Sequence, residues 1–314
     1  MRALVTGAAG FVGRHLTTHL LSQGHELGGL VHPMDGGPGS LGPRVEVFPL
    51  DILDEAALGA SLLDFAPDAV FHLAAFSNPE GSWKEARRTL ETNIIGAHNL
   101  LWAAMESGSR PRVLLVGSAQ QYGDVPAEAQ PISEEREQRP LTPYAVSKTS
   151  QELLGRRSVW SDELPVYITR SFNHTGPGQA DGYVSSSFAR QVAEVERGTR
   201  EPLIRVGNLG ARRDFTDVRD VAAAYCAIVE RGQPGRPYNV CRGEAVSIRE
   251  VLDELVRLSR VPVQVVVDPE RYHALDARLM VGDPTRLKTE TGWSPRYSLH
   301  ETLRDLLDDW RTRL

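Results

Sequence analysis

Cysteine is scarce in this sequence, whose 314 residues include only Cys226 and Cys241. Two separate thiols are too few for a disulfide framework and too scattered for a metal site. We therefore expect no bound metal. We expect both cysteines to be core residues of a protein that works in a reducing compartment.

Long apolar runs and excess positive charge are also missing. No stretch approaches the ~20 apolar residues that a membrane-spanning helix needs. The net charge of −6 argues against a nucleic acid as partner. The first residues run directly into a short apolar strand and leave no room for a signal peptide. We expect a cytoplasmic protein that binds neither membrane nor nucleic acid.

The hydrophobic pattern predicts an α/β fold. With 41% hydrophobic residues, the chain can bury a large core. Apolar runs typical of buried strands alternate with helical stretches up to residue 170, which is the pattern of a doubly wound parallel sheet, or Rossmann fold. The apolar runs lie at 2–6, 27–31, 45–48, 69–73, 112–117 and 165–170, and the helical stretches near 11–23, 54–64, 84–107 and 143–158.

The alternation loosens after residue 170. Helices near 185–197, 218–231, 247–259 and 299–312 surround short strands at 203–206, 237–241 and 263–267. We expect these segments to build a smaller substrate-binding lobe, while residues 1–170 form the nucleotide-binding domain.

Three glycines follow the first apolar run at three-residue spacing. Gly7 permits a tight turn from strand to helix, Gly10 lets the backbone approach a pyrophosphate, and Gly13 allows the helix to pack closely on the strand. The helix that follows, with Phe11 and Val12 in its first turn, would point its amino terminus at the anion. The turn predicts a dinucleotide cofactor.

Tyr144 and Lys148 are four residues apart in a predicted helix, so their side chains share one face. An ammonium beside the phenol favours the phenolate. Lowering the pKa of the phenol from ~10 to about 7 takes roughly 4 kcal/mol, within reach of Lys148 together with a cofactor's positive ring. Ser118, upstream behind an apolar run, would hold the substrate oxygen. The three residues predict proton transfer beside a nicotinamide.

With five further segments, these motifs make the sequence resemble the extended short-chain dehydrogenases/reductases that modify nucleotide sugars. The resemblance runs nearly end to end, and the segments are 50–52 (LDI), 71–75 (FHLAA), 92–93 (TN), 170–179 (RSFNHTGPGQ) and 212–220 (RRDFTDVRD). The last two are the most specific. They resemble most closely the branch that holds GDP-mannose 4,6-dehydratases and GDP-4-keto-6-deoxymannose reductases, and 213–220 is similar to the reductase form.

The resemblance implies roles for particular residues. Lys148 also binds the nicotinamide ribose, and Asn93 supports a proton relay around Lys148. Residues around 218–241 return to the nucleotide-binding sheet, so the substrate-binding lobe is discontinuous and consists of 171–217 and 242–314. A homodimer forms through the helices near 84–107 and 143–158. The implied cofactor-binding residues are Gly7, Gly10, Phe11, Val12, Gly13, His32, Asp51, Ile52, Leu73, Ala74, Ala75, Tyr144 and Lys148.

The end of the second strand bears on the choice of coenzyme. An acid there would bind both ribose hydroxyls and repel a 2′-phosphate, but the family position holds Val31. This loss favours NADP(H), with Arg14 and His32 as distant candidates for the phosphate. NAD(H), with Asp35 as the ribose ligand, stays open, as does the use of both coenzymes.

The residues after Ser118 narrow the reaction. Where this chain has Ala119 and Gln120, family dehydratases have an acid; family double epimerases have a cysteine at the position of Gln120 and a histidine in a later loop, which 179–187 lacks. The resemblance therefore implies reduction of the C4 ketone of a nucleotide-linked 4-keto-6-deoxyhexose, with GDP-4-keto-6-deoxymannose favoured and Tyr144 as proton donor. A nucleotide-sugar epimerase with retained NAD, a 4,6-dehydratase and a non-catalytic nucleotide-sugar sensor remain as alternatives.

The resemblance also implies which residues bind the substrate. Ser118 and Gln120 would face the sugar, and Asn173 would contact the sugar or its phosphate. Arg213 would bind the diphosphate, because a guanidinium matches phosphate oxygens bidentately, and Arg212 is a second candidate.

A later loop departs from the family pattern. His273 occupies the place of a family arginine, so Arg271 or Arg278 would have to supply the second positive charge. The nucleotide base, the sugar and the configuration of the new hydroxyl group are therefore left open.

Overall fold

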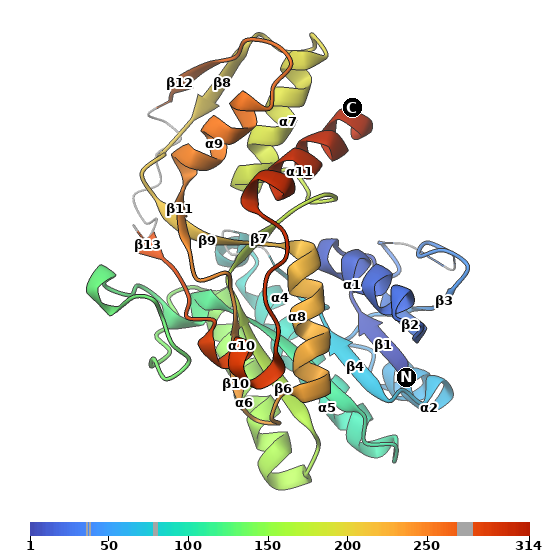
Figure 1. The fold of residues 1–314 in the computed structure, drawn as a ribbon. Coiled ribbons are helices and arrows are strands. Elements are labelled where there is room, and N and C mark those ends of the chain that lie inside the picture. Colours follow the sequence, from blue (N-terminus) through green and yellow to red (C-terminus); the bar gives the residue numbers. More distant parts are fainter. Residues whose placement is uncertain (36, 38, 78–80, 269–278) are drawn as a thin grey trace.

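The computed structural model describes residues 1–35, 37, 39–77, 81–268 and 279–314. Two parts are visible in Figure 1: a sheet flanked by helices, and a smaller helical lobe beyond one end of its strands. The doubly wound parallel sheet with a smaller lobe, as predicted from the sequence, is confirmed.

The large sheet has seven strands in the order β10-β6-β5-β4-β1-β2-β3, and every neighbouring pair is parallel. The chain order reverses direction between β1 and β4, and ligands of such sheets bind in the crevice outside the carboxyl ends of the strands at this point. The strands are β1 (Arg2–Thr6), β2 (Glu26–Val31), β3 (Val45–Pro49), β4 (Ala69–His72), β5 (Arg112–Ser118), β6 (Val166–Ser171) and β10 (Pro237–Val240).

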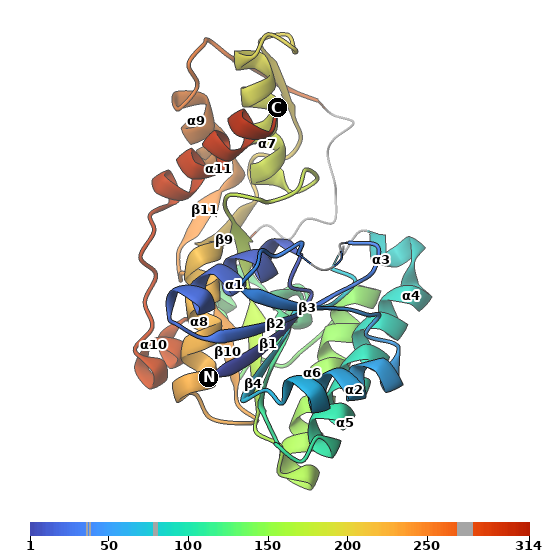
Figure 2. The same cartoon turned by 90° about the vertical axis from the view of Figure 1, so that its right-hand side faces the viewer.

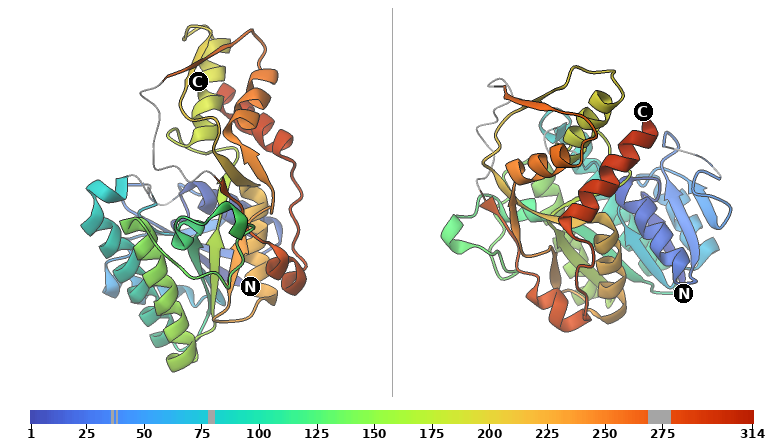
Figure 3. Two further views of the ribbon diagram at one scale, coloured as in Figure 1. Left: turned by 90° about the vertical axis from the view of Figure 1, so that its left-hand side faces the viewer. Right: turned by 45° about the horizontal axis from the view of Figure 1, so that its top comes forward.

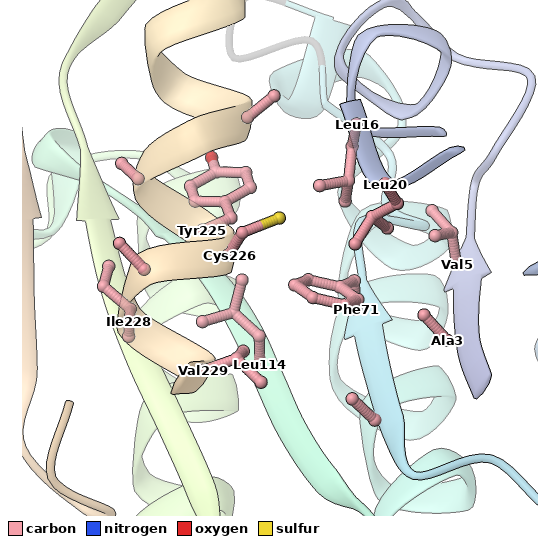
Figure 4. Packing of buried hydrophobic residues seen from close by; sticks show 14 of the residues in the cluster. Ala3, Val5, Leu16, Leu20, Phe71, Leu114, Tyr225, Cys226, Ile228 and Val229 are labelled. Atoms are coloured by element: carbon pink, nitrogen blue, oxygen red, sulfur yellow. The ribbon is translucent and has the colours of Figure 1, made fainter. Parts of the chain in front are cut away.

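Helices cover both faces of this sheet, as the left view of Figure 3 shows. On one face lie α1 (Phe11–Ser22) and α8 (Val218–Arg231), and on the other α2 (Glu55–Phe65), α5 (Gly96–Glu106) and α6 (Pro143–Asp162). In Figure 4, Tyr225, Cys226 and Ile228 of α8 face a core that also contains Leu16 and Phe71. Cys226 and Cys241 are both buried and free, which confirms the core placement expected for them.

One predicted helix is interrupted. Instead of a single helix over 84–107, the chain forms α3 (Gly81–Lys84), α4 (Ala86–Leu90), a π-helical turn (Glu91–Ile95) and α5. A π turn accommodates one extra residue, which rotates the following side chains, and such turns are frequent at functional sites. Asn93 lies in this turn and is fully buried.

The lobe has its own hydrophobic core between α7 (Val184–Glu196), α9 (Ile248–Arg257) and α11 (Leu299–Arg313). Figure 2 shows these three helices above the sheet layer. Two small sheets complete the lobe. They consist of β8 (Leu203–Val206) with β12 (Gln264–Val267), and of β7 (Asn173–Thr175), β9 (Arg212–Asp217), β11 (Ala245–Ser247) and β13 (Leu279–Met280).

The chain crosses between the two parts several times. β10 lies at the edge of the large sheet beside β6, although β7, α7 and β8 of the lobe separate the two in sequence. α10 (Thr285–Thr291) falls in the range expected for the lobe, but it packs against α8 and β10, and Leu287 and Trp293 belong to the core of the sheet layer. Neither part is therefore formed by one continuous stretch of the chain.

Asp214 on β9 connects this strand to the segment after β10 and to the segment after β13. It is fully buried on β9, and its carboxylate accepts hydrogen bonds from the backbone N–H groups of Arg242 (2.8 Å), Gly243 (2.8 Å) and Gly282 (3.4 Å). Burial raises the pKa of Asp214 from 3.8 to about 6 despite these bonds.

The raised pKa predicts a pH-dependent stability. Because the folded protein binds this proton more tightly than the unfolded chain, the stabilisation from Asp214 is full below about pH 4 and is lost as the pH rises through 6. The stability of wild type relative to Asp214→Asn should therefore fall by about 2 kcal/mol between pH 4 and pH 7. Urea denaturation of both proteins across this range measures the difference, and a difference that does not change with pH would contradict the prediction.

Candidate active site

The glycine turn between β1 and α1 leaves no space for side chains. Gly7 has φ +67°, and a Cβ atom there would lie 2.9 Å from the backbone nitrogen of Ala74. A Cβ on Gly13 would lie 2.3 Å from the carbonyl oxygen of Gly7, and one on Gly10 would lie 3.1 Å from the same atom. The turn brings the start of α1 against the ends of β1 and β4.

The amino terminus of α1 is suited to an anion. Gly10 precedes the helix and provides no side-chain cap, and the first turn contains no acidic residue. The N–H groups of this first turn, which includes Phe11, Val12 and Gly13, have no partner within the helix, and the helix dipole adds positive potential there. The residues present fit the pyrophosphate of a dinucleotide.

The other residues expected to bind the cofactor follow β2, β3 and β4. His32 Nε2 lies 3.7 Å from Asp51 Oδ2, and both side chains are partly exposed. Ile52 is buried beside them. Leu73 and Ala74 continue from β4, with N–H groups bonded to Thr6; Ala75 comes next along the chain.

The residues that bear on the choice between NAD(H) and NADP(H) lie near the end of β2 and beside the glycine turn. Val31, at the end of β2, is buried in the core of the sheet layer. Asp35 is exposed after β2, and its N–H donates to the carbonyl of His32. Arg14 is anchored beside the glycine turn, where its Nε donates to the Ala9 carbonyl at 2.9 Å.

Ser118, Tyr144 and Lys148 meet at the carboxyl end of β5. Ser118 is the last residue of this strand, and its hydroxyl group is hydrogen-bonded to the phenol of Tyr144. Tyr144 lies in the first turn of α6, which Thr142 caps by accepting from Ala145 N–H at 3.0 Å. Lys148 lies one turn later, as its spacing predicts.

Burial changes the protonation of both groups on α6. It raises the pKa of Tyr144 to about 12, although the hydrogen bond from Ser118 opposes the rise, and it lowers the pKa of Lys148 to about 7. The lysine ammonium donates to Val116 O (2.9 Å) and Gln151 Oε1 (3.0 Å). In this structure the pKa of the phenol thus moves upward, opposite to the shift expected from Lys148 and a cofactor ring. Tyr144 is held in the form that can donate a proton.

Asn93 braces α6 from the π-helical turn. Its side-chain amide donates to Ser147 Oγ at 2.8 Å and to Phe76 O at 3.2 Å, and its oxygen accepts from Phe76 N–H at 2.7 Å. Ser147 directly precedes Lys148. Asn93 therefore joins the loop after β4 to α6, and its part in a proton relay stays a prediction.

The expected substrate residues come from both parts of the molecule. Gln120 is half-buried in a 3₁₀ turn (Ala119–Tyr122), where its N–H donates to Ser118 Oγ at 3.2 Å. Asn173 is exposed on β7, which pairs with β9, where Arg213 is half-buried and donates to the Arg212 carbonyl. Arg271, His273 and Arg278 lie outside the described residues.

Two hydrogen-bonding arrangements of α6 could not be predicted from the sequence. Ser82, on α3, accepts from the backbone N–H of Tyr144 at 3.4 Å. Gln151 shares the Val116 carbonyl with Lys148. Both depend on how α3 and β5 pack against α6, which no local pattern encodes.

A family model described as GDP-mannose 4,6 dehydratase matches residues 4–306. The chain belongs to this family. The family lies within the extended short-chain dehydrogenases/reductases, so the resemblance inferred from the motifs is confirmed.

Relatives of this chain within and around the family carry out different reactions. GDP-6-deoxy-D-mannose reductase from Pseudomonas aeruginosa is 36% identical over 100% of this chain and 98% of the relative. A structure of RMD from the same species with NADPH has a TM-score of 0.88 and 35% identity, covering 100% of this chain and 99% of the other. UDP-glucose 4-epimerase from Thermus thermophilus with NAD has a TM-score of 0.89 and 28% identity, covering 100% of both. The relatives are nucleotide-sugar enzymes that use a nicotinamide cofactor.

The structure adds two observations on the remaining expectations. None of the helices in the described ranges combines the length and apolarity that crossing a membrane requires. Within the same ranges, no group of three or more His, Cys, Asp or Glu side chains is arranged to hold a metal ion.

Proposed function

We propose that this protein is an NAD(P)H-dependent 4-ketoreductase that acts on a GDP-linked 4-keto-6-deoxyhexose, with GDP-4-keto-6-deoxymannose as the favoured substrate. The observation that carries the proposal is the pair formed by Ser118 and a protonated, half-buried Tyr144 at the carboxyl end of β5. The full-length similarity to GDP-6-deoxy-D-mannose reductase supports the substrate.

The residues divide the work of reduction among them. The reduced nicotinamide, when bound, supplies the hydride. Ser118 orients the carbonyl oxygen, and Tyr144 donates its proton to the developing alkoxide. Lys148 binds the nicotinamide ribose, and its pKa of about 7 allows it to pass a proton on near neutral pH. Gln120, Asn173, Arg213 and Arg278 are the proposed substrate contacts.

This chain lacks the acidic residue that family dehydratases have after the serine. Ala119 and Gln120 follow Ser118, and neither side chain can give or take a proton as a carboxyl group does. The family name therefore does not fix the reaction, because the reductase and the dehydratase differ at this position.

Epimerisation is the second candidate. The TM-score of 0.89 to a UDP-glucose 4-epimerase with NAD favours it, since the same Ser118, Tyr144 and Lys148 would serve oxidation and re-reduction. An epimerase needs retained NAD and consumes no added coenzyme.

NADP(H) is the coenzyme that we favour. Val31 replaces the acid that would repel a 2′-phosphate, and His32 and Arg14 lie beside the edge where the phosphate would bind. The complex of the Pseudomonas aeruginosa relative with NADPH supports this choice.

The test is coenzyme consumption with GDP-4-keto-6-deoxymannose generated freshly by a separate dehydratase. We expect one NADPH to be oxidised per product, with a higher kcat/KM for NADPH than for NADH. No oxidation by folded protein would refute the substrate assignment. Product formation without added coenzyme, from protein that copurifies with NAD, would favour the epimerase.

A homodimer is proposed through α5 and α6. Val146, Leu153 and Trp160 recur every seven residues along α6, as do Ile95 and Trp102 before and in α5, and all five side chains are exposed. Seven-residue spacing places the members of each set on one helix face. Two such apolar stripes on neighbouring helices match a surface that a second copy would cover.

Charge in this stripe should dissociate the dimer. In Leu153→Arg, a cation replaces a side chain that is 59% exposed in the single chain, and burying it unpaired in an interface is costly. We expect size-exclusion chromatography with light scattering to give a dimer mass for wild type and a monomer mass for this variant. Leu63→Arg on α2, where the side chain is 64% exposed, is the matched control and should stay dimeric. An unchanged mass for Leu153→Arg would contradict this interface.

A further inference from the structure

A buried polar network lies behind the catalytic residues. The side-chain oxygen of Gln121 accepts from the backbone N–H of Ser118 at 2.7 Å, and its Nε2 donates to Glu152 Oε2 at 2.8 Å. Arg170 donates to both oxygens of Glu152, at 2.9 Å and 2.7 Å. Gln121, Glu152 and Arg170 are each at least 98% buried. The network connects the end of β5 with α6 and β6.

The backbone around Gln121 is arranged to allow this connection. Ser118 caps the 3₁₀ turn reciprocally. Its hydroxyl group accepts from Gln120 N–H, and its backbone N–H donates to the side-chain oxygen of Gln121. A Cβ atom on Gly117 would lie 2.5 Å from the Gln121 side-chain oxygen and 2.2 Å from the carbonyl oxygen of Thr169. Glycine at 117 thus leaves the space into which the amide folds back.

Glu152 lies on the catalytic face of α6. It follows Lys148 by four residues and Tyr144 by eight, so the three side chains lie along one side of the helix. Burial pushes the pKa of Glu152 upward, but the hydrogen bonds and charge of Arg170 outweigh burial and hold this pKa below its ordinary value. The carboxylate stays ionised and provides a fixed acceptor for the Gln121 amide.

We propose that Gln121 is a positioning residue, which fixes the Ser118 hydroxyl group against the Tyr144 phenol by linking the Ser118 backbone to Glu152. Two connections then join Ser118 itself to α6: the bond between Ser118 and Tyr144 at the site, and the link through Gln121 to Glu152 two turns further along the helix. A single bond would let the hydroxyl swing about its partner, whereas two separated connections fix its direction. The inference rests on the proposed reduction, in which Ser118 and Tyr144 share the substrate oxygen.

Gln121→Met tests the link, because methionine has a similar length but neither accepts from Ser118 nor donates to Glu152. We expect kcat to fall on the order of 10–100-fold, with the KM for coenzyme nearly unchanged, since positional errors act on the chemical step. Gln121→Asn, which keeps the amide but is too short to reach both partners, should fall similarly and serves if the methionine variant does not fold. Gln138→Met is the matched control: Gln138 also accepts from the Gln121 amide, at 3.3 Å, but lies outside the link.

Combining the Gln121 substitution with Ser118→Ala distinguishes a positioning role from a general loss of structure. In Ser118→Ala, the Gln121 substitution has no hydroxyl left to position, so we expect no further loss of kcat. If the two losses multiply, Gln121 acts on something other than Ser118 and the proposal is overturned.

A measurement without substrate keeps this test independent of the proposed function. Hydrogen exchange of the Ser118 N–H should be at least tenfold faster in Gln121→Met than in wild type and Gln138→Met, since its acceptor is lost. Unchanged exchange would overturn the link even if reduction is observed. Faster exchange in a protein that oxidises no NADPH would support the link and refute only the substrate assignment.

Discussion

Tyr144→Phe should reduce coenzyme oxidation by about 10²–10⁴-fold, because the substitution removes the group that donates the proton. The ring stays in place and only the hydroxyl group is lost, so the packing of α6 should be preserved. Burial already holds the phenol in its protonated form, with a pKa raised to about 12, and its hydroxyl partner Ser118 remains in the variant. Stopped-flow absorbance of NADPH with the 4-keto sugar measures the effect.

Two controls make the Tyr144 result specific. Tyr167→Phe on β6 removes a hydroxyl group from a buried tyrosine outside the site and should retain activity. NADPH should bind Tyr144→Phe with a dissociation constant within a few-fold of wild type, since Lys148 is unchanged. Full activity of Tyr144→Phe would remove this residue from the chemistry and with it the proposed mechanism.

Arg170→Met should lower the free energy of unfolding by about 3–5 kcal/mol, the range found when one partner of a buried ion pair is removed. Glu152 is 2% exposed, and Arg170 donates to both of its oxygens from within the core, at 2.9 Å and 2.7 Å. Arg170 also donates to the Tyr122 hydroxyl at 3.1 Å and to the Glu134 carbonyl at 3.0 Å, so its removal leaves these acceptors without that donor. Urea denaturation of wild type and variant measures the loss.

A matched variant tests whether burial is the cause. Arg156 pairs with the same carboxylate of Glu152 at 2.8 Å, but its side chain is 27% exposed. Arg156→Met should cost less than about 1 kcal/mol, as partly exposed pairs do. Adding Glu152→Met to Arg170→Met should recover part of the loss, because the uncompensated buried charge is then removed. Equal losses for the two arginine variants would contradict this account.

Short-range patterns in the sequence were sufficient for the layers of the fold and for the central site. Gly10 and Gly13 are constrained by contacts within one turn, and Tyr144 and Lys148 by the period of one helix. Such features depend on nearby residues, so they can be recognised before any tertiary contact is known. The contacts of Asn93 in the π-helical turn could not, because its partners Phe76 and Ser147 are 17 and 54 residues away in the sequence.

The polar network behind the site was beyond the reach of the sequence for a related reason. Gln121 and Glu152 are 31 residues apart, and Glu152 and Arg170 are 18 apart, so their meeting depends on the register of β5, β6 and α6. Nothing local distinguishes these side chains from solvated polar residues. The same holds for α10, whose packing against α8 depends on where the chain returns to the sheet.

The position of β10 also has a consequence for the protein while it is being made. Until residues 237–240 leave the ribosome, β6 has an unpaired edge, and until α8 has formed, the apolar side chains of β4 and β5 on its face are open to water. Open edges and exposed apolar faces invite aggregation in nascent chains. A chain that stopped after α6 would contain Ser118, Tyr144 and Lys148 but would lack the strand and helix that close the sheet around them. The proposed catalytic groups are therefore translated early, before the segments that complete the sheet around them.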